Sequence, residues 1–217
     1  MTDAYKVPDL APGAFHRAEE TVRRSRFIVT MARVSSPEEA KAFIDRIREE
    51  HAGATHNCWA YNAGAPGDTA QVGASDDGEP KGTAGRPMLT ALLHSDVGEV
   101  AAVVTRYFGG ILLGAGGLTR AYAKAAKDAL DNAGKARMQP FSVLLLECPY
   151  PMFERIKLLI EGHEGRIESS DYGAAVTLTF LLPVQKVADF SAALTELSGG
   201  QLSVEEVEQR FLPGARE

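Results

Sequence analysis

The 217-residue sequence predicts an α+β protein made of two domains. Its length exceeds the roughly 150 residues of an average domain. Its strand and helix patterns also change character near residue 134. From residue 140 onward they follow the order β-α-β-β-α-β, which is typical of a ferredoxin-like fold. We therefore expect an N-terminal domain at 1–134, a linker at 135–139 and a ferredoxin-like domain at 140–217.

The N-terminal domain begins with two expected strands and a well-marked helix. The strands fall within 15–34, where a β-rich run follows a cluster of arginines. The helix is expected over 37–51. Ser36 can cap it, Pro37 suits its first position, and Glu39 completes a capping box.

The middle of this domain combines two strands with two glycine-rich segments. The first strand, 56–63, places alternate side chains on opposite faces, with Asn57, Trp59 and Tyr61 on one face and His56, Cys58 and Ala60 on the other. A polar segment at 75–85 is followed by a short helix that Pro87 opens. The apolar run 100–107 predicts a buried strand. A glycine cluster at 114–117 then leads into an alanine-rich helix over 118–132.

The C-terminal domain supplies the remaining elements. We expect a strand at 141–148, a helix at 151–161, strands at 166–172 and 175–182 joined at Gly173, a helix at 184–197 and a last strand at 201–207. Residues 135–217 carry 8 basic and 12 acidic residues, against 15 and 17 in 1–134. The C-terminal domain is therefore the less suited of the two to binding RNA.

Composition excludes several classes of protein. With 23 basic and 29 acidic residues the net charge is −6, which argues against a uniformly basic nucleic-acid-binding protein but leaves room for a local patch such as the arginines at 23, 24 and 26. Cys58 and Cys148 are too few for a disulfide framework or an all-cysteine metal site. We recognise no signal peptide and no membrane span, so we expect a cytoplasmic protein without a membrane partner.

The run from Tyr107 to Tyr122 carries the strongest functional signal. It predicts a strand, a glycine-rich loop and a helix, and backbone amides at such a helix N-terminus bind anions. Arg106 and Arg120 would add positive charge. The run lacks the Gly-Lys-Ser/Thr of a Walker motif and has no clean dinucleotide fingerprint. Its glycines therefore have two interpretations. They help the helix N-terminus to bind an anion or, as the simpler interpretation, they only permit a tight crossover of the chain.

The acidic turn at 76–79 has two interpretations. Its oxygens could hold a cation, although the spacing does not match an EF-hand loop. Ion pairs with Lys81, Arg86 or Arg106 explain the same residues better.

Two further sets of residues are better explained by packing than by chemistry. His56 and Cys58 share a strand face, but neither a second pair of metal ligands nor an orienting partner for a nucleophile is evident nearby. Four aromatic residues could stack on nucleic-acid bases, although a core that is poor in aromatics needs several of them: Trp59, Tyr61, Tyr107 and Phe108.

Two long strings of residues resemble the signature of the YigZ/IMPACT family. They are DDGEPKGTAGRP at 76–87 and RYFGGILLGAGGL at 106–118, and HNCWAY at 56–61 fits the same family. The resemblance implies an N-terminal domain with the fold of the second domain of ribosomal small-subunit protein five, in which helices cover one face of a mixed, mostly antiparallel sheet. It also implies a C-terminal domain similar to that of elongation factor G, and a link to translation.

We expect a non-enzymatic binding protein associated with translation regulation, whose partner is RNA or a protein of the translation machinery and which needs no cofactor. The alternative is a phosphate- or nucleotide-binding enzyme that uses the glycine-rich loop at 109–117. Against this alternative, the loop itself contains no Lys, Ser or Thr to reach a phosphate. The sequence assigns no catalytic and no metal-binding residue.

The two glycine-rich segments, 75–86 and 106–120, should meet in one cleft. Both lie at the entry to a helix, and two helix N-termini facing one cleft would attract an anion. The candidate ligand-binding residues of this cleft are Asp76, Asp77, Glu79, Lys81, Arg86, Arg106, Gly109, Gly110, Gly114, Gly116, Gly117 and Arg120.

Overall fold

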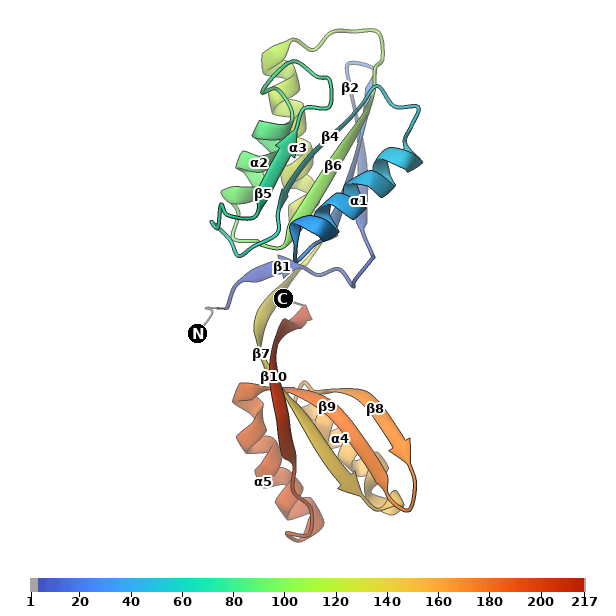
Figure 1. Cartoon of the computed structure of the whole chain (residues 1–217), viewed down its shortest axis with the longest axis vertical. Coiled ribbons are helices and arrows are strands. Elements are labelled where there is room, and N and C mark those ends of the chain that lie inside the picture. The colour runs from blue at the N-terminus through green and yellow to red at the C-terminus, as the bar shows by residue number, and fades with distance from the viewer. Residues whose placement is uncertain (1–3, 217) are drawn as a thin grey trace. The chain divides into compact units, whose positions relative to one another are not determined.

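The computed structural model describes residues 4–216, which separate into two compact units (Figure 1). Unit 1 consists of the described residues up to Arg137 together with Arg216, and unit 2 is Met138–Ala215. Residues 1–3 and 217, at the ends of the two expected domains, lie outside the described part. Each unit combines strands and helices around a core of its own, as the α+β prediction requires. In the described part of the chain, no helix has the length and apolar character needed to cross a membrane.

Unit 1 is built on a five-stranded sheet with the strand order β2-β3-β6-β4-β5, in which each neighbouring pair is antiparallel. The elements of this unit are β1 (Lys6–Pro8), β2 (His16–Val22), β3 (Ser25–Arg33), α1 (Pro37–Glu50), β4 (His56–Asn62), β5 (Val72–Ser75), α2 (Gly85–Leu93), β6 (Val100–Tyr107) and α3 (Ala115–Asn132).

Helices cover both faces of this sheet, whereas the resemblance implied helices on one face only. α2 and α3 pack on the face that carries Phe27 and Val104, and α1 packs on the opposite face, where Ile44 and Ile47 contact Val103 (Figure 1). The central strand β6 explains the difference, because all of its residues except the last are buried. A strand buried on both sides needs an apolar cover on each face. The sheet is also wholly antiparallel rather than mixed.

Unit 2 confirms the ferredoxin-like prediction. Its strand order is β10-β7-β9-β8, and α4 and α5 pack against one face of this sheet (Figure 1). The core between them joins Leu146, Leu178 and Phe180 of the strands to Ile156 of α4 and Phe190 of α5. The elements are β7 (Lys135–Cys148), α4 (Phe153–Gly162), β8 (Arg166–Tyr172), β9 (Val176–Pro183), α5 (Val187–Ser198) and β10 (Glu205–Arg216), with short 3-10 helices at Tyr150–Met152 and Val184–Lys186.

Several elements extend beyond their expected bounds. β7 starts at Lys135 rather than at 141, because residues 135–137 pair with β1; the expected linker 135–139 is therefore strand, and the division between the two units falls within it. The last strand starts and ends later than expected and pairs with β7. α2 starts at Gly85, two residues before Pro87, and α3 starts at Ala115, so that it includes three of the four residues of the glycine cluster.

Candidate functional site

The two glycine-rich segments meet through a buried ion pair. Arg106, at the end of β6, donates to Glu79 Oε1 at 2.6 Å, and these two side chains are only 5% and 3% exposed. The hydroxyl of Tyr122, from α3, donates to the same oxygen at 2.8 Å. Burial, with the nearby acidic groups, raises the pKa of Tyr122, so this hydroxyl keeps its proton. Ser25 Oγ accepts from Arg106 at 3.2 Å, which ties β3 into the same cluster.

The carboxylate of Asp76 caps α2 and is therefore engaged within the protein. It accepts hydrogen bonds from three backbone N–H groups, those of Gly82 at 2.7 Å, Ala84 at 2.9 Å and Gly85 at 2.9 Å. Burial raises the pKa of Asp76, but the three donors lower it by more, so the net shift is downward. Because this side chain already accepts from the amides of Ala84 and Gly85 at the start of α2, those two donors are not available to an external anion.

The other charged candidates of the first segment do not converge on a ligand. Asp77 accepts from Arg48 at 2.8 Å and from the backbone N–H of Asn57 at 2.6 Å. Lys81 and Arg86 are exposed. Of the predicted ion pairs, the structure forms the one between Glu79 and Arg106 and, in the described residues, adds the one between Asp77 and Arg48.

The tip of the β2–β3 hairpin lies against the glycine-rich loop at 108–114. Its two turn residues, Arg23 and Arg24, have φ values of +46° and +64°, as both central residues of a type I′ turn must be left-handed. Arg23 donates to the carbonyl oxygen of Leu112 at 3.4 Å. A Cβ at Gly109 would overlap the carbonyl of Arg24, so only glycine permits this approach.

This loop exposes three large apolar side chains. Phe108 is 46% exposed, Ile111 39% and Leu112 79%. Neighbouring exposed hydrophobic residues mark interaction sites, whereas isolated ones are common on any surface. The exposed Arg23 and Arg24 adjoin them. We refer to Arg23, Arg24, Phe108, Ile111 and Leu112 as the hairpin–loop surface.

A cavity of about 350 Å³ adjoins this surface between the hairpin and α3. Its lining includes three cations, Arg23, Arg120 and Lys124, and one carboxylate, Glu20. Lys124 is paired with Glu20 at 2.9 Å, whereas Arg23 and Arg120 have no carboxylate partner in the described part of the chain. Gly117, in the first turn of α3, also lines the cavity, and the positive end of the helix dipole lies there. The charged lining of the cavity is therefore positive on balance, and it includes the hairpin rather than residues 75–86.

The other glycines of the second segment shape the backbone. Gly110 and Gly114 have φ values of +82° and +71°, which favour glycine. Gly116 is exposed, and a Cβ there would meet only the Arg120 guanidinium, at 3.6 Å. Substitution at Gly116 would therefore act on Arg120 before it disturbed the core.

The packing interpretation fits most of the remaining candidates. Burial raises the pKa of Cys58 to about 12, so its thiol stays protonated and unreactive. Trp59 and Tyr61 pack in the core beneath α1. Within residues 4–216, no cluster of three or more His, Cys, Asp or Glu could hold a metal ion. Of the four aromatic candidates, Phe108 is the one that the structure leaves open to solvent.

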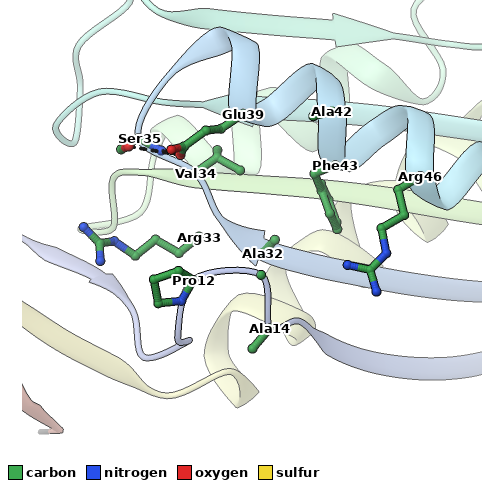
Figure 2. A pocket seen from close by; sticks show the side chains of 11 residues that line it. Pro12, Ala14, Ala32, Arg33, Val34, Ser35, Glu39, Ala42, Phe43 and Arg46 are labelled. Carbon is green, nitrogen blue, oxygen red and sulfur yellow. Dashed lines mark hydrogen bonds between the residues drawn. The ribbon is translucent and has the colours of Figure 1, made fainter.

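A larger cavity, of about 530 Å³, lies between α1, the end of β3 and the turn before β2 (Figure 2). Small side chains such as Ala14, Ala32 and Ala42 leave this space unfilled. Its Glu39 is occupied, because it accepts from the backbone N–H of Ser35 at 2.7 Å and from the Ser35 hydroxyl at 3.0 Å (Figure 2). No sequence motif predicts this cavity, since its lining comes from three separate segments without a charge pattern.

Comparison with known proteins covers both halves of the chain. Residues 23–130 match the Impact N-terminal domain, and residues 146–201 match a domain described as a domain of unknown function (DUF1949). The chain is 43% identical to a solved structure titled as the crystal structure of a hypothetical protein, with a TM-score of 0.61 over 96% of this chain and 99% of that one.

Three curated relatives share one family name. The chain is 46% identical over 200 residues to the IMPACT family member YigZ of Escherichia coli (strain K12), covering 92% of this chain and 98% of that protein. It is 38% identical over 197 residues to the IMPACT family member YvyE of Bacillus subtilis (strain 168), covering 91% and 90%. Protein IMPACT-A of Xenopus tropicalis is 35% identical over 117 residues, which is 52% of this chain and 36% of that protein. With these matches along nearly its whole length, the chain belongs to the IMPACT family.

Proposed function

We propose that this chain is a non-enzymatic binding protein of the translation machinery and that the hairpin–loop surface of unit 1 contacts RNA. The observation that carries the proposal is the pair of arginines at the hairpin turn. Left-handed backbone at a non-glycine residue costs roughly 1–3 kcal/mol. Both Arg23 and Arg24 adopt it, at a turn where Asn-Gly is the usual choice. Strain of this kind supports a role for the two side chains in binding.

Local charge supports the proposal despite the net charge of −6. Arg23, Arg24 and Arg120 are exposed, and no carboxylate among the described residues neutralises them. Arg26, the third member of the sequence cluster, differs because it is paired with Glu19 at 2.8 Å. RNA affinity depends on cations that can replace the counterions of the phosphates. We therefore assign phosphate contacts to the first three arginines and not to Arg26.

The link to translation rests on the family resemblance. A first domain like that of a ribosomal protein and a second like that of a translation factor favour ribosomal RNA as the natural ligand. This is an argument by analogy of fold, and the charged surface is the independent argument from chemistry. Cosedimentation with ribosomal subunits tests the analogy directly.

The decisive experiment is fluorescence anisotropy with a short labelled single-stranded RNA. We compare the wild type with Arg23→Ala/Arg24→Ala/Arg120→Ala and with a matched control, Lys41→Ala/Arg46→Ala/Lys127→Ala, which removes the same charge elsewhere in unit 1. Loss of three phosphate contacts should lower the slope of log affinity against log salt by about 2, since each contact contributes about 0.7 for a single strand. Equal slopes in the two triple variants would refute the assignment.

The alternative, a phosphate- or nucleotide-binding enzyme, is favoured by one observation. Gly117 places the first turn of α3 in the lining of the cavity of about 350 Å³ that also contains Arg23, Arg120 and Lys124. ATP added to the same assay distinguishes the two functions. Tight ATP binding that Arg120→Ala abolishes, in a protein that does not bind RNA, would support the alternative.

A further inference from the structure

We infer that the hairpin–loop surface takes single-stranded rather than duplex RNA and that the ring of Phe108 is the platform on which a base stacks. The inference rests on the proposed function and deepens it, because it names the form of the nucleic acid and a residue that selects it. Phe108 is exposed, so core packing does not explain it, and its side chain has no charge with which to contact a phosphate.

Contacts with neighbouring residues fix the position of Phe108. The guanidinium carbon of Arg106 lies 5.4 Å from the centroid of the Phe108 ring, and it lies 5.5 Å from the ring of Phe27. Arg106 itself is fixed by its buried bond to Glu79 at 2.6 Å. The backbone N–H of Phe108 also donates to Thr55 Oγ1 at 3.0 Å. A side chain that is ordered before binding loses less conformational entropy when the ligand arrives.

Phe108 is also open to solvent. It is 46% exposed, whereas Phe27 in the adjacent core is 2% exposed. The neighbouring Tyr107 is less exposed than Phe108, and its hydroxyl bonds to His51 at 3.0 Å, so its ring is less available. One ring at the end of β6 therefore presents a free aromatic surface.

The surroundings of this ring favour a nucleobase over an apolar protein side chain. Gly109 packs against the Arg24 carbonyl, so Phe108 precedes a residue that contacts the arginine turn. Single-stranded binding sites combine such cations, which follow the phosphates, with aromatic rings on which bases stack. In a duplex the bases are already stacked on one another, so an exposed ring on a surface gains this contact only with an unpaired base.

The test measures the affinity of the full chain for a single-stranded RNA and for the duplex formed by the same sequence. We compare the wild type with Phe108→Ala, Phe108→Leu and Phe108→Trp, and with Leu158→Ala as the matched control, since Leu158 is a more exposed apolar residue that lies outside the hairpin–loop surface, in α4 of unit 2. Phe108→Ala should weaken single-strand binding by about 5- to 150-fold without changing the salt slope, as expected for a lost stacking contact. Phe108→Leu keeps the apolar bulk but loses the aromatic ring, so its affinity should fall as that of Phe108→Ala does. Phe108→Trp keeps an aromatic ring and should retain the wild-type affinity. Leu158→Ala should have little effect.

The outcomes separate the inference from the proposed function. Equal affinity for single strand and duplex, or a Phe108→Ala effect no larger than that of Leu158→Ala, would overturn the inference and leave RNA binding intact. Failure of the wild type to bind either RNA would overturn the proposed function and the inference with it. A Phe108→Leu variant that binds as well as the wild type would show that the residue contributes apolar bulk alone, which also overturns the stacking role.

Discussion

Replacing the turn Arg23-Arg24 by Asn-Gly should stabilise unit 1 and weaken RNA binding at the same time. Relief of two left-handed arginines is worth about 1–2 kcal/mol for each residue, and the entropy that glycine adds to the unfolded chain offsets up to about 1 kcal/mol. The exposed 3.4 Å bond from Arg23 to Leu112 is long and contributes little. The net gain should be about 1–3 kcal/mol, or roughly 2–12 °C in the midpoint of thermal unfolding.

The assay is urea unfolding followed by tryptophan fluorescence. The chain has a single tryptophan, and Trp59 lies in β4, so the signal reports on unit 1. The matched control is Glu164→Gly, which relieves a left-handed residue (φ +62°) in unit 2 and should leave both the tryptophan transition and RNA affinity unchanged. If Arg23→Asn/Arg24→Gly destabilises unit 1, or stabilises it without loss of RNA affinity, the idea that strain is maintained there for binding is wrong.

Three further predictions concern stability. Glu79→Gln should cost about 3–5 kcal/mol in urea unfolding, because it leaves a buried arginine without its carboxylate; a change below about 1 kcal/mol would show that the ion pair holds little together. Hydrogen bonds from Lys135 and Lys6 lower the pKa of Asp96 to about 2, so the stabilisation that Asp96 gives unit 1 should be present above about pH 4 and be lost as the pH falls toward about 2. Asp96→Asn should flatten that part of the plot of unfolding free energy against pH. Because Asp96 is half-exposed, the difference should be small and should shrink with added salt. Residues 138–217 expressed alone should melt cooperatively by circular dichroism, whereas a disordered fragment would contradict an independent second domain.

Local patterns in the sequence predicted most of the elements and failed where distant segments meet. Ser36 caps α1 as expected and accepts from the N–H of Glu39 at 3.1 Å, but the Glu39 carboxylate bonds to Ser35, one residue before the capping box places it. The start of β7 carries no strand signal of its own. It is a strand because Lys135 and its neighbours pair with β1, far away in the sequence.

The candidate site shows the same division. The pairing of Glu79 with Arg106 was one of several that charge alone allowed, and only the fold selects it. The contact between Arg23 and Leu112 joins residues 89 positions apart, so no local motif connects the hairpin to the glycine-rich loop. The sequence identified both parts separately. Their proximity follows from the pairing of β3 with β6, which brings Arg26 opposite Tyr107.

The most direct test of the RNA-binding surface is nuclear magnetic resonance mapping of the whole chain, labelled with nitrogen-15 and titrated with a short single-stranded RNA. Binding at the hairpin–loop surface predicts that the amide shifts concentrate at residues 22–26 and 107–120, and that they shrink together as salt is added. Unit 2 and the residues that line the larger cavity should keep their shifts. Perturbations confined to unit 2, or to the residues that line the larger cavity, would contradict RNA binding at the hairpin–loop surface.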